Sequence, residues 1–238
     1  MQLRESPFRA LPCVSVADDA EVKDDLGRSC CPLCAATDSD DFFRDRRRSY
    51  QQCRHCRLVF VPPRYHLSPE TEKAEYDLHR NDPHDPGYRR FLGRLFEPVR
   101  RRLPVGSRGL DFGCGPGPAL ALMFAEAGYP MSVYDPFYAD VPQRLRQRYD
   151  FITATEVVEH LRRPGEELQR LWRLLEPGGL LGIMTKRVID REAFAGWHYR
   201  RDPTHVCFFS DETFEWLAQC WGAGLEFVGN DVVILARR

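Results

Sequence analysis

The sequence has very few lysines and no long apolar run. Only three of its 34 basic residues are lysine, and the others are arginine. No stretch approaches the roughly 18 apolar residues that a membrane span requires, so we expect no membrane partner. The first 25 residues contain acids and no apolar core, which argues against a secretory signal or a transit peptide. These absences predict a cytoplasmic protein.

An excess of one charge sign is also missing. The 34 basic residues are matched by 35 acidic ones, for a net charge of −1. Composition therefore gives no global electrostatic case for nucleic-acid binding. The bias toward arginine is what a GC-rich genome produces, although arginine is also the side chain best suited to phosphate. Seven arginines nevertheless gather in one short segment: Arg44, Arg46, Arg47, Arg48, Arg54, Arg57 and Arg64.

What the sequence does contain is enough apolar material for a core. Hydrophobic residues make up 43% of the 238 positions, which excludes overall disorder and suits one full domain with an appendage. We divide the chain into an N-terminal tail (1–28), a ribbon (29–65), a helical connector or lid (66–106) and a main domain (107–238).

Two Cys-x-x-Cys pairs mark the ribbon. Cys31 and Cys34 form the first pair, and Cys53 and Cys56 the second, with 18 residues between them. Each pair offers two thiolates from one tight turn, and together they complete a tetrahedral zinc site. A segment this short could hardly fold without such a site. A redox pair, disulfides, or Cys30 in place of Cys31 remain alternatives to structural Zn²⁺.

The connector contains two predicted helices. Ser68 followed by Pro69 is a typical helix start, and this helix can extend to about His79. After a turn-rich break, the residues from Phe91 to Val99 place apolar side chains on one helix face. Tyr76, His79 and Tyr88 would either cap an active site or pack between the helices.

The main domain alternates strands and helices, which indicates a parallel sheet. A short strand leads into the glycine-rich turn at 113–117, and a second strand ends at Asp135. Glycines in such a turn let the backbone approach a nucleotide-like ligand, and the acid can accept the ribose hydroxyls. Pro118 stands where a dinucleotide-binding fingerprint requires its third glycine.

Five features in order carry a resemblance: Asp111-x-Gly113-x-Gly115-x-Gly117, Asp135, the strand at 149–156, Val-Val-Glu-His-Leu at 157–161, and Leu-Glu-Pro-Gly-Gly at 175–179. In these features the main domain resembles a class I S-adenosylmethionine-dependent methyltransferase. The resemblance implies an α/β, Rossmann-like, doubly wound and mostly parallel sheet with an antiparallel last strand. It further implies that S-adenosyl-L-methionine is bound by Asp111, Gly113, Cys114, Gly115, Gly117, Asp135 and Glu156. Only 14 residues separate Asp135 from Asp150, so the third strand is short or missing and we expect about six strands.

Candidate catalytic residues follow the fourth and fifth strands. In a helix, Glu156, Glu159 and His160 would share one face, and His205 would face them from a later loop. This set suits Mg²⁺ or Mn²⁺ and resembles that of metal-assisted O-methyltransferases, although members without a metal also carry the Glu-His pair. Alternatively His205, with a pKa near 6.5, acts as a general base. The catalytic candidates are therefore His205, His160 and Glu156.

Three functions remain open at this point. A small metabolite with a hydroxyl or amine is favoured, because Trp197, Tyr199, Phe208 and Phe209 could line an apolar pocket. The alternative is an RNA or protein substrate that docks on the arginine-rich ribbon. A cofactor-binding module without catalysis is the third. The sequence does not indicate an oligomeric state.

Overall fold

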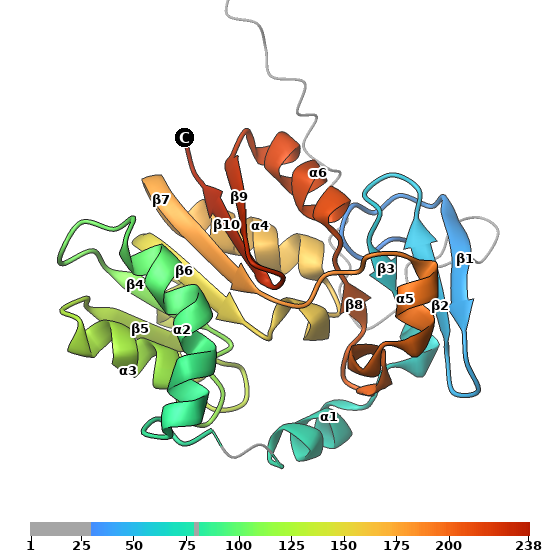
Figure 1. Cartoon of the computed structure of the whole chain (residues 1–238), viewed down its shortest axis with the longest axis horizontal. Helices are drawn as coiled ribbons and strands as arrows, with labels where there is room; N and C mark the ends of the chain where they lie inside the picture. Colours follow the sequence, from blue (N-terminus) through green and yellow to red (C-terminus); the bar gives the residue numbers. More distant parts are fainter. Residues whose placement is uncertain (1–29, 79–80) are drawn as a thin grey trace, which may run out of the picture.

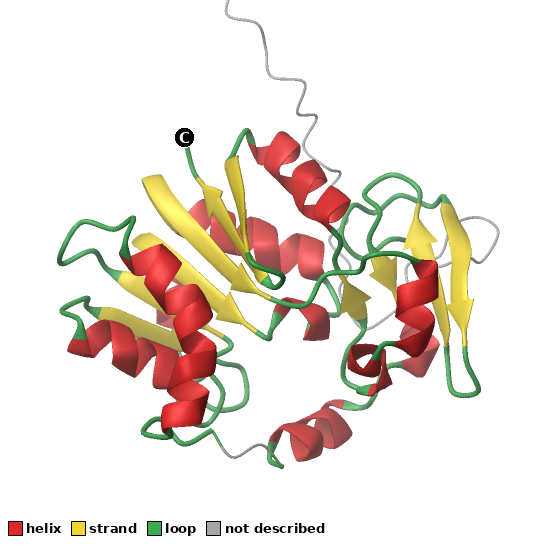
Figure 2. Ribbon diagram, in the orientation of Figure 1, coloured by secondary structure: helices red, strands yellow, loops and turns green. Residues whose placement is uncertain are grey.

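The computed structural model describes residues 30–78 and 81–238 (Figures 1 and 2). The predicted tail at 1–28, and His79 at the expected end of the first connector helix, lie outside the described residues. None of the helices in the described ranges is long and apolar enough to cross a membrane. The cytoplasmic location stays a prediction.

A six-stranded sheet forms the main domain, with strand order β5-β4-β6-β7-β10-β9. The strands are β4 (Gly109–Phe112), β5 (Met131–Tyr134), β6 (Tyr149–Thr155), β7 (Leu175–Met184), β9 (Gly224–Val228) and β10 (Val232–Ala236). The first four in spatial order are parallel, and β10 runs antiparallel to both β7 and β9. The predicted Rossmann-like sheet of about six strands with an antiparallel end is confirmed.

The expected third strand is missing. Between β5 and β6 the chain forms a single 3-10 helix, η2 (Pro142–Arg146), whose last turn is tied down by Tyr149. The hydroxyl of Tyr149 donates to the Arg144 carbonyl at 2.9 Å. The connection from β5 to β6 contains no further strand that could pair with β5. Strand β5 therefore pairs only with β4 and forms the edge of the sheet.

Four helices cover the two faces of the sheet (Figure 1). One face carries α2 (Pro86–Arg100) and α3 (Ala119–Glu126), and the other carries α4 (Pro164–Leu174) and α6 (Asp211–Trp221). Their apolar stripes supply the two cores, as the helical periodicity predicts. A Cβ atom on Gly182 of β7 would lie 2.9 Å from Val99, so this glycine lets α2 pack closely on the sheet.

The ribbon is a second, smaller sheet of order β1-β2-β3-β8. Its first three strands are β1 (Ser39–Arg44), β2 (Ser49–Cys53) and β3 (Val59–Phe60). The fourth, β8 (Cys207–Phe208), comes from the loop before α6 and pairs antiparallel with β3. The N–H of Val61 continues this pairing with a 2.9 Å hydrogen bond to the Val206 carbonyl. The ribbon therefore shares its sheet with the loop that carries His205.

The connector crosses the carboxyl ends of the parallel strands (Figure 1). After η1 (Pro63–Tyr65), α1 (Pro69–Tyr76) begins at the predicted cap, where the Ser68 hydroxyl accepts from the Thr71 N–H. The end of α1 is held on one side by Tyr138, whose hydroxyl donates to Asp77 at 2.6 Å. On the other side Glu72 pairs with Arg162 at 2.7 Å. The helix thus connects the loop after β5 with the loop after β6.

Candidate active site and cysteine cluster

The glycine-rich loop after β4 is shaped by close packing. Gly113 and Gly115 have φ values of +73° and +63°, a region that favours glycine. A Cβ atom on Gly113 would lie 2.4 Å from the Val157 side chain, and one on Gly117 would lie 1.9 Å from the Asn81 carbonyl oxygen. The loop is enclosed between the end of β6 and the connector, and larger residues do not fit.

Asp135 follows β5 and is fixed against this loop. Its Oδ2 atom accepts from the Gly115 N–H at 3.0 Å, while Oδ1 accepts from the N–H groups of Phe137 and Tyr138 at 2.8 and 3.2 Å. The side chain is buried. The structure therefore brings together the glycines and the acid that the resemblance assigns to the cofactor.

The other expected cofactor residues lie in the same region. Asp111 is buried in β4 and accepts from the Thr153 hydroxyl at 2.8 Å, and burial raises its pKa to about 7. Burial raises the pKa of the Cys114 thiol to about 12. It also raises the pKa of Tyr88 to about 12, assisted by the nearby negative charges of Asp111 and Glu156. Tyr88 of α2 thus lies near Asp111 and Glu156, and its ring also stacks on Phe91 of the same helix.

The four predicted zinc ligands converge. The Sγ atoms of Cys31, Cys34, Cys53 and Cys56 all lie within 4.8 Å of one another, and all four residues are buried. Hydrogen bonding among the crowded thiols raises the pKa of Cys31 and lowers the pKa of Cys53.

The two cysteine turns have the same geometry. Ala35 and Arg57, each directly after the second cysteine of a pair, have φ values of +59° and +62°. Their N–H groups donate to the carbonyls of Cys31 and Cys53 at 2.9 and 3.1 Å. Two equivalent knuckles that present four crowded thiols fit one tetrahedral zinc ion.

The segment after β6 is not the helix expected for residues 156–160. The Glu156 N–H donates to the Met184 carbonyl at 2.8 Å, so β6–β7 pairing extends through this residue. Glu156 then turns the chain with a φ of +52°, and only one 3-10 turn, η3 (Val158–His160), follows. The prediction of a shared helical face is wrong, because the regular helix α4 begins only at Pro164.

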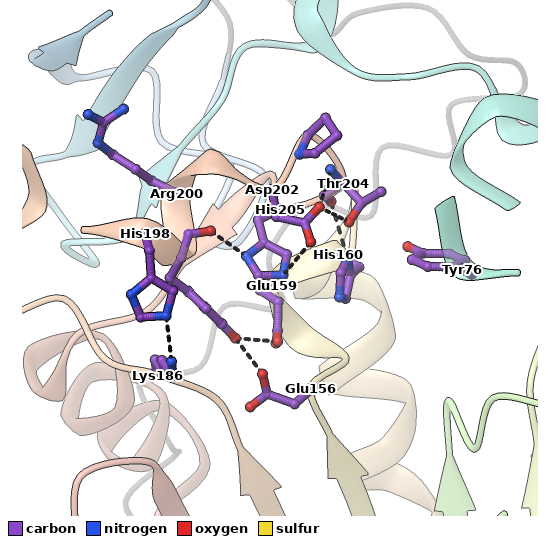
Figure 3. Close-up of polar contacts among 12 residues, drawn as sticks. Tyr76, Glu156, Glu159, His160, Lys186, His198, Arg200, Asp202, Thr204 and His205 are labelled. Carbon is purple, nitrogen blue, oxygen red and sulfur yellow. Dashed lines mark hydrogen bonds and ion pairs between the residues drawn. The ribbon is translucent and has the colours of Figure 1, made fainter. Parts of the chain in front are cut away.

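Three side chains nevertheless meet at this edge of the sheet (Figure 3). Glu159, His160 and His205 each place a possible ligand atom within 4.8 Å of the others. Nδ1 of His205 lies 2.7 Å from the Tyr199 carbonyl, and Nδ1 of His160 lies 3.3 Å from the Thr204 carbonyl. Since a carbonyl only accepts, both Nδ1 atoms carry the proton, and Nε2 of each ring is the possible ligand atom; Nε2 of His205 also lies 3.8 Å from Oδ2 of Asp202.

Tyr199 in η4 (His198–Arg201) holds the acidic side of the cluster. Its hydroxyl donates to Oε1 of Glu159 and lies 3.3 Å from Oε2 of Glu156. The Oε2 atom of Glu159 is buried and has no hydrogen-bond partner among the described residues. The structure thus assembles three of the four predicted ligands, whereas Glu156 joins them only through Tyr199. The sequence offered no signal for this role beyond a tyrosine in the loop after the fifth strand.

Burial changes the protonation of the cluster. It raises the pKa of both Glu156 and Glu159, because it disfavours their charged forms. It lowers the pKa of His205 to about 4 and that of His160 to about 3. The expectation of a His205 pKa near 6.5 is therefore wrong, and both imidazoles are neutral at pH 7.

Helix α1 lies over this cluster. The ring of Tyr76 meets His160 edge-on at 5.3 Å between centroids and contacts Phe137 at 5.8 Å. Tyr76 therefore spans the cofactor and histidine sides of the site, as a capping residue would.

Phe208 and Phe209 do not line the expected apolar pocket, whereas the half-buried Trp197 lines a small cavity with Val188 and Phe194. Phe208 and Phe209 are 1% and 0% exposed. Phe208 packs edge-on against Phe194 of α5 (Arg191–Gly196) and against Tyr50 of the ribbon, with ring centroids 5.3 and 5.9 Å apart. These rings form the core between the ribbon and the loop.

Comparisons with known proteins identify the domain and support its fold. Residues 83–228 match the family model described as a methyltransferase domain. The fold is similar to that of the Burkholderia thailandensis 1,6-didemethyltoxoflavin-N1-methyltransferase, solved with 1,6-didemethyltoxoflavin and S-adenosylhomocysteine. That match has 15% identity, a TM-score of 0.50, and covers 84% of this chain and 99% of the other. Streptomyces venezuelae DesVI matches at 16% identity and a TM-score of 0.47, covering 73% of this chain and 100% of its own. A comparison with curated proteins finds no match.

Proposed function

Since the chain belongs to the methyltransferase-domain family and is an S-adenosylmethionine-dependent methyltransferase, we propose that it methylates a hydroxyl oxygen of a small molecule. The acceptor oxygen would bind at the cluster of Glu159, His160 and His205. An amine acceptor is the closest variant of this function.

The cofactor would lie along the ends of β4 and β5. The close backbone packing of Gly113 and Gly117 and the fixed carboxylate of Asp135 fit the methionine and ribose parts of S-adenosylmethionine. Asp111, Cys114 and Glu156 complete this set, and Tyr88 of α2 lies near it. Methyl transfer needs little covalent help from the protein, because the sulfonium is already electrophilic. The task of these residues is alignment.

A single observation carries the assignment of the acceptor site. Glu159 keeps one buried oxygen, Oε2, without a partner among the described residues, and it offers a ligand atom within 4.8 Å of those of His160 and His205, whose rings backbone carbonyls orient through Nδ1. Metal-ligating histidines are held in this way, and a carboxylate with two imidazoles is a familiar divalent-ion set. The residues present fit Mn²⁺ better than Mg²⁺, since Mg²⁺ prefers oxygen ligands.

The chain's own groups would prepare the acceptor. A divalent ion held by Glu159, His160 and His205 would lower the pKa of a bound hydroxyl. The carbonyls of Tyr199 and Thr204 keep the imidazole Nε2 atoms unprotonated, and the Tyr199 hydroxyl fixes the Glu159 carboxylate. Tyr76 of α1 would limit the access of water above His160.

We also assign structural Zn²⁺ to Cys31, Cys34, Cys53 and Cys56. The crowded, buried thiols and the matching knuckles support this assignment. With four thiolates bound, zinc has no open position, so it would serve as a scaffold. We also propose the domain boundaries expected from the sequence: a ribbon at 29–65, a connector at 66–106 and a main domain at 107–238.

The deciding experiment measures turnover of S-adenosylmethionine with separate small-molecule and RNA fractions of cell extract. We expect S-adenosylhomocysteine to form with the small-molecule fraction, to stop after chelation, and to resume with Mn²⁺. Mn²⁺ binding followed by electron paramagnetic resonance should weaken in Glu159→Gln and persist in Glu167→Gln, an acid of α4 outside the cluster. Turnover that is insensitive to chelator would exclude a catalytic metal and leave His205 as the candidate base. Turnover with the RNA fraction alone would exclude a small-molecule substrate.

A further inference from the structure

A basic pocket lies between the ribbon and the loop that carries His205. Its volume is about 410 Å³, within the range of small-ligand sites. The β1–β2 turn, including Arg46 and Arg47, forms one wall, and Arg201 and Pro203 form the other. Tyr65 of η1 supplies an aromatic edge. None of these residues belongs to the cofactor or metal sets described above.

The charge in this pocket is strongly unbalanced. Five arginines and a single carboxylate, Asp45, line it. Asp45 is already satisfied, because it accepts from Arg200 at 2.6 Å and from the N–H groups of Arg47 and Arg48 at 2.8 and 2.9 Å. It therefore cannot neutralise the remaining guanidinium groups.

Two of the arginines build the frame and three remain available. Arg48 is 7% exposed and donates to the carbonyls of Arg200 and Asp202 at 2.5 and 2.7 Å. The side chains of Arg46, Arg47 and Arg201 have no acceptor within the part of the chain that the structure describes, and all three are exposed. A rigid frame that presents three unpaired guanidinium groups is complementary to an anion with several oxygens.

We propose that this pocket binds the phosphoryl group of a phosphorylated small molecule. Arginine forks match phosphate oxygens, and the half-buried ring of Tyr65, on which Arg64 stacks at 4.7 Å, lines the same pocket. Arg54, elsewhere on the ribbon, is neutralised, because it pairs with Asp40 at 2.5 Å and lies 3.6 Å from Asp38. A pocket of this small volume fits a compact phosphate ester better than an extended nucleic-acid backbone.

The pocket is connected to the acceptor site through one short loop. Arg201 and Pro203 line the pocket, while Asp202 between them lies 3.8 Å from Nε2 of His205. A ligand held by its phosphate would therefore lie against the same loop that carries His205. Its identity as the methyl acceptor rests on the proposed function, whereas the binding of phosphate does not.

The test compares two double variants that each remove two positive charges. Arg46→Gln/Arg201→Gln lies in the pocket, and Arg90→Gln/Arg146→Gln changes exposed arginines elsewhere. Titration with inorganic pyrophosphate and with uridine diphosphate, at fixed ionic strength, should show binding to the native protein. We expect it to weaken at least tenfold in the pocket variant and by less than twofold in the control. S-adenosylhomocysteine affinity, measured on the same samples, should not change.

Each other outcome is decisive. Absence of phosphate binding, or equal weakening of that binding in both variants, would overturn the proposal that the pocket binds phosphate. Pocket-dependent binding of a single-stranded RNA oligonucleotide without binding of either small phosphate would overturn the small-molecule ligand. If S-adenosylhomocysteine fails to bind while pyrophosphate binds through the pocket, the proposed function fails and the phosphate site stands. Thermal unfolding of both variants checks that they are folded, and Arg47→Gln repeats the test with one substitution.

Discussion

The candidate active site has a cofactor half, after β4 and β5, and a histidine half, around Glu159, His160 and His205, and the two are built in different ways. The cofactor half uses one nearly continuous segment, from Asp111 to Asp135, fixed by backbone hydrogen bonds. The histidine half combines the end of β6, the loop after β7 and the ribbon, whose strand β3 pairs with β8. The cofactor half therefore depends mostly on residues close in sequence, although Val157 and Asn81 enclose its glycine loop, while the histidine half depends on packing between distant segments. Changes in the ribbon should affect acceptor chemistry much more than cofactor binding.

The largest effect should come from removing zinc. Cys53→Ser/Cys56→Ser should lower zinc content from about one per chain to near zero and destabilise the fold, because structural zinc contributes on the order of 10 kcal/mol to small sites. Elemental analysis and thermal unfolding measure both. Cys220→Ser, at a half-exposed position of α6, is the matched control. Full zinc retention in the double variant would contradict the assignment.

Next in size is the loss of His205. His205→Ala should reduce turnover by roughly 10²–10⁴, the range for an acid–base or metal-binding group in contact with substrate. S-adenosylhomocysteine affinity should stay within about twofold, because His205 lies away from β4 and β5. Steady-state rates and calorimetry separate the two readouts. Unchanged turnover on the true substrate would exclude His205 from catalysis.

In the cofactor half, Asp111 should make stability depend on pH. Its folded pKa of about 7 lies above the ordinary value of 3.8. Between about pH 4 and 7 the unfolded chain releases this proton while the folded chain keeps it, so stability falls as pH rises. The slope is at most about 1.4 kcal/mol per pH unit. Urea unfolding across this range should show the decline in the native protein and a flatter profile in Asp111→Asn. Equal slopes would contradict the raised pKa.

The smallest effect should follow from Asp135→Ala. Loss of hydrogen bonds between a carboxylate and the ribose should weaken S-adenosylhomocysteine binding by roughly 1.5–3 kcal/mol. Zinc content should remain unchanged, since the ribbon lies in the other half. Calorimetry gives the affinity, and Asp140→Asn in the same loop serves as the control. Binding of NADH in place of S-adenosylhomocysteine would show that the cofactor half has been misassigned.

The contrast between the halves also explains what the sequence could predict. The glycine loop, Asp135 and the missing third strand depend on short spacings, so they are visible along the chain. The convergence of Glu159, His160 and His205 was predicted for the wrong local reason, since a strand extension and a 3-10 turn replace the expected helix.

Features that depend on tertiary packing could not be predicted from the sequence. Phe208 and Phe209 look like pocket residues, but their surroundings make them core. The low pKa of His205 follows from burial, which residue spacing does not show. Strand β8 has only two residues, too few for any alternating pattern.

The β3–β8 pairing has a consequence for how the chain folds. Val59 and Phe60 meet Cys207 and Phe208 about 150 residues later. A contact of such high sequence separation forms late, because a long loop must close before the pairing stabilises it. During synthesis the two cysteine knuckles emerge long before their fourth strand. The ribbon would therefore complete its sheet, and the histidine loop its final position, only after most of the large domain has been made.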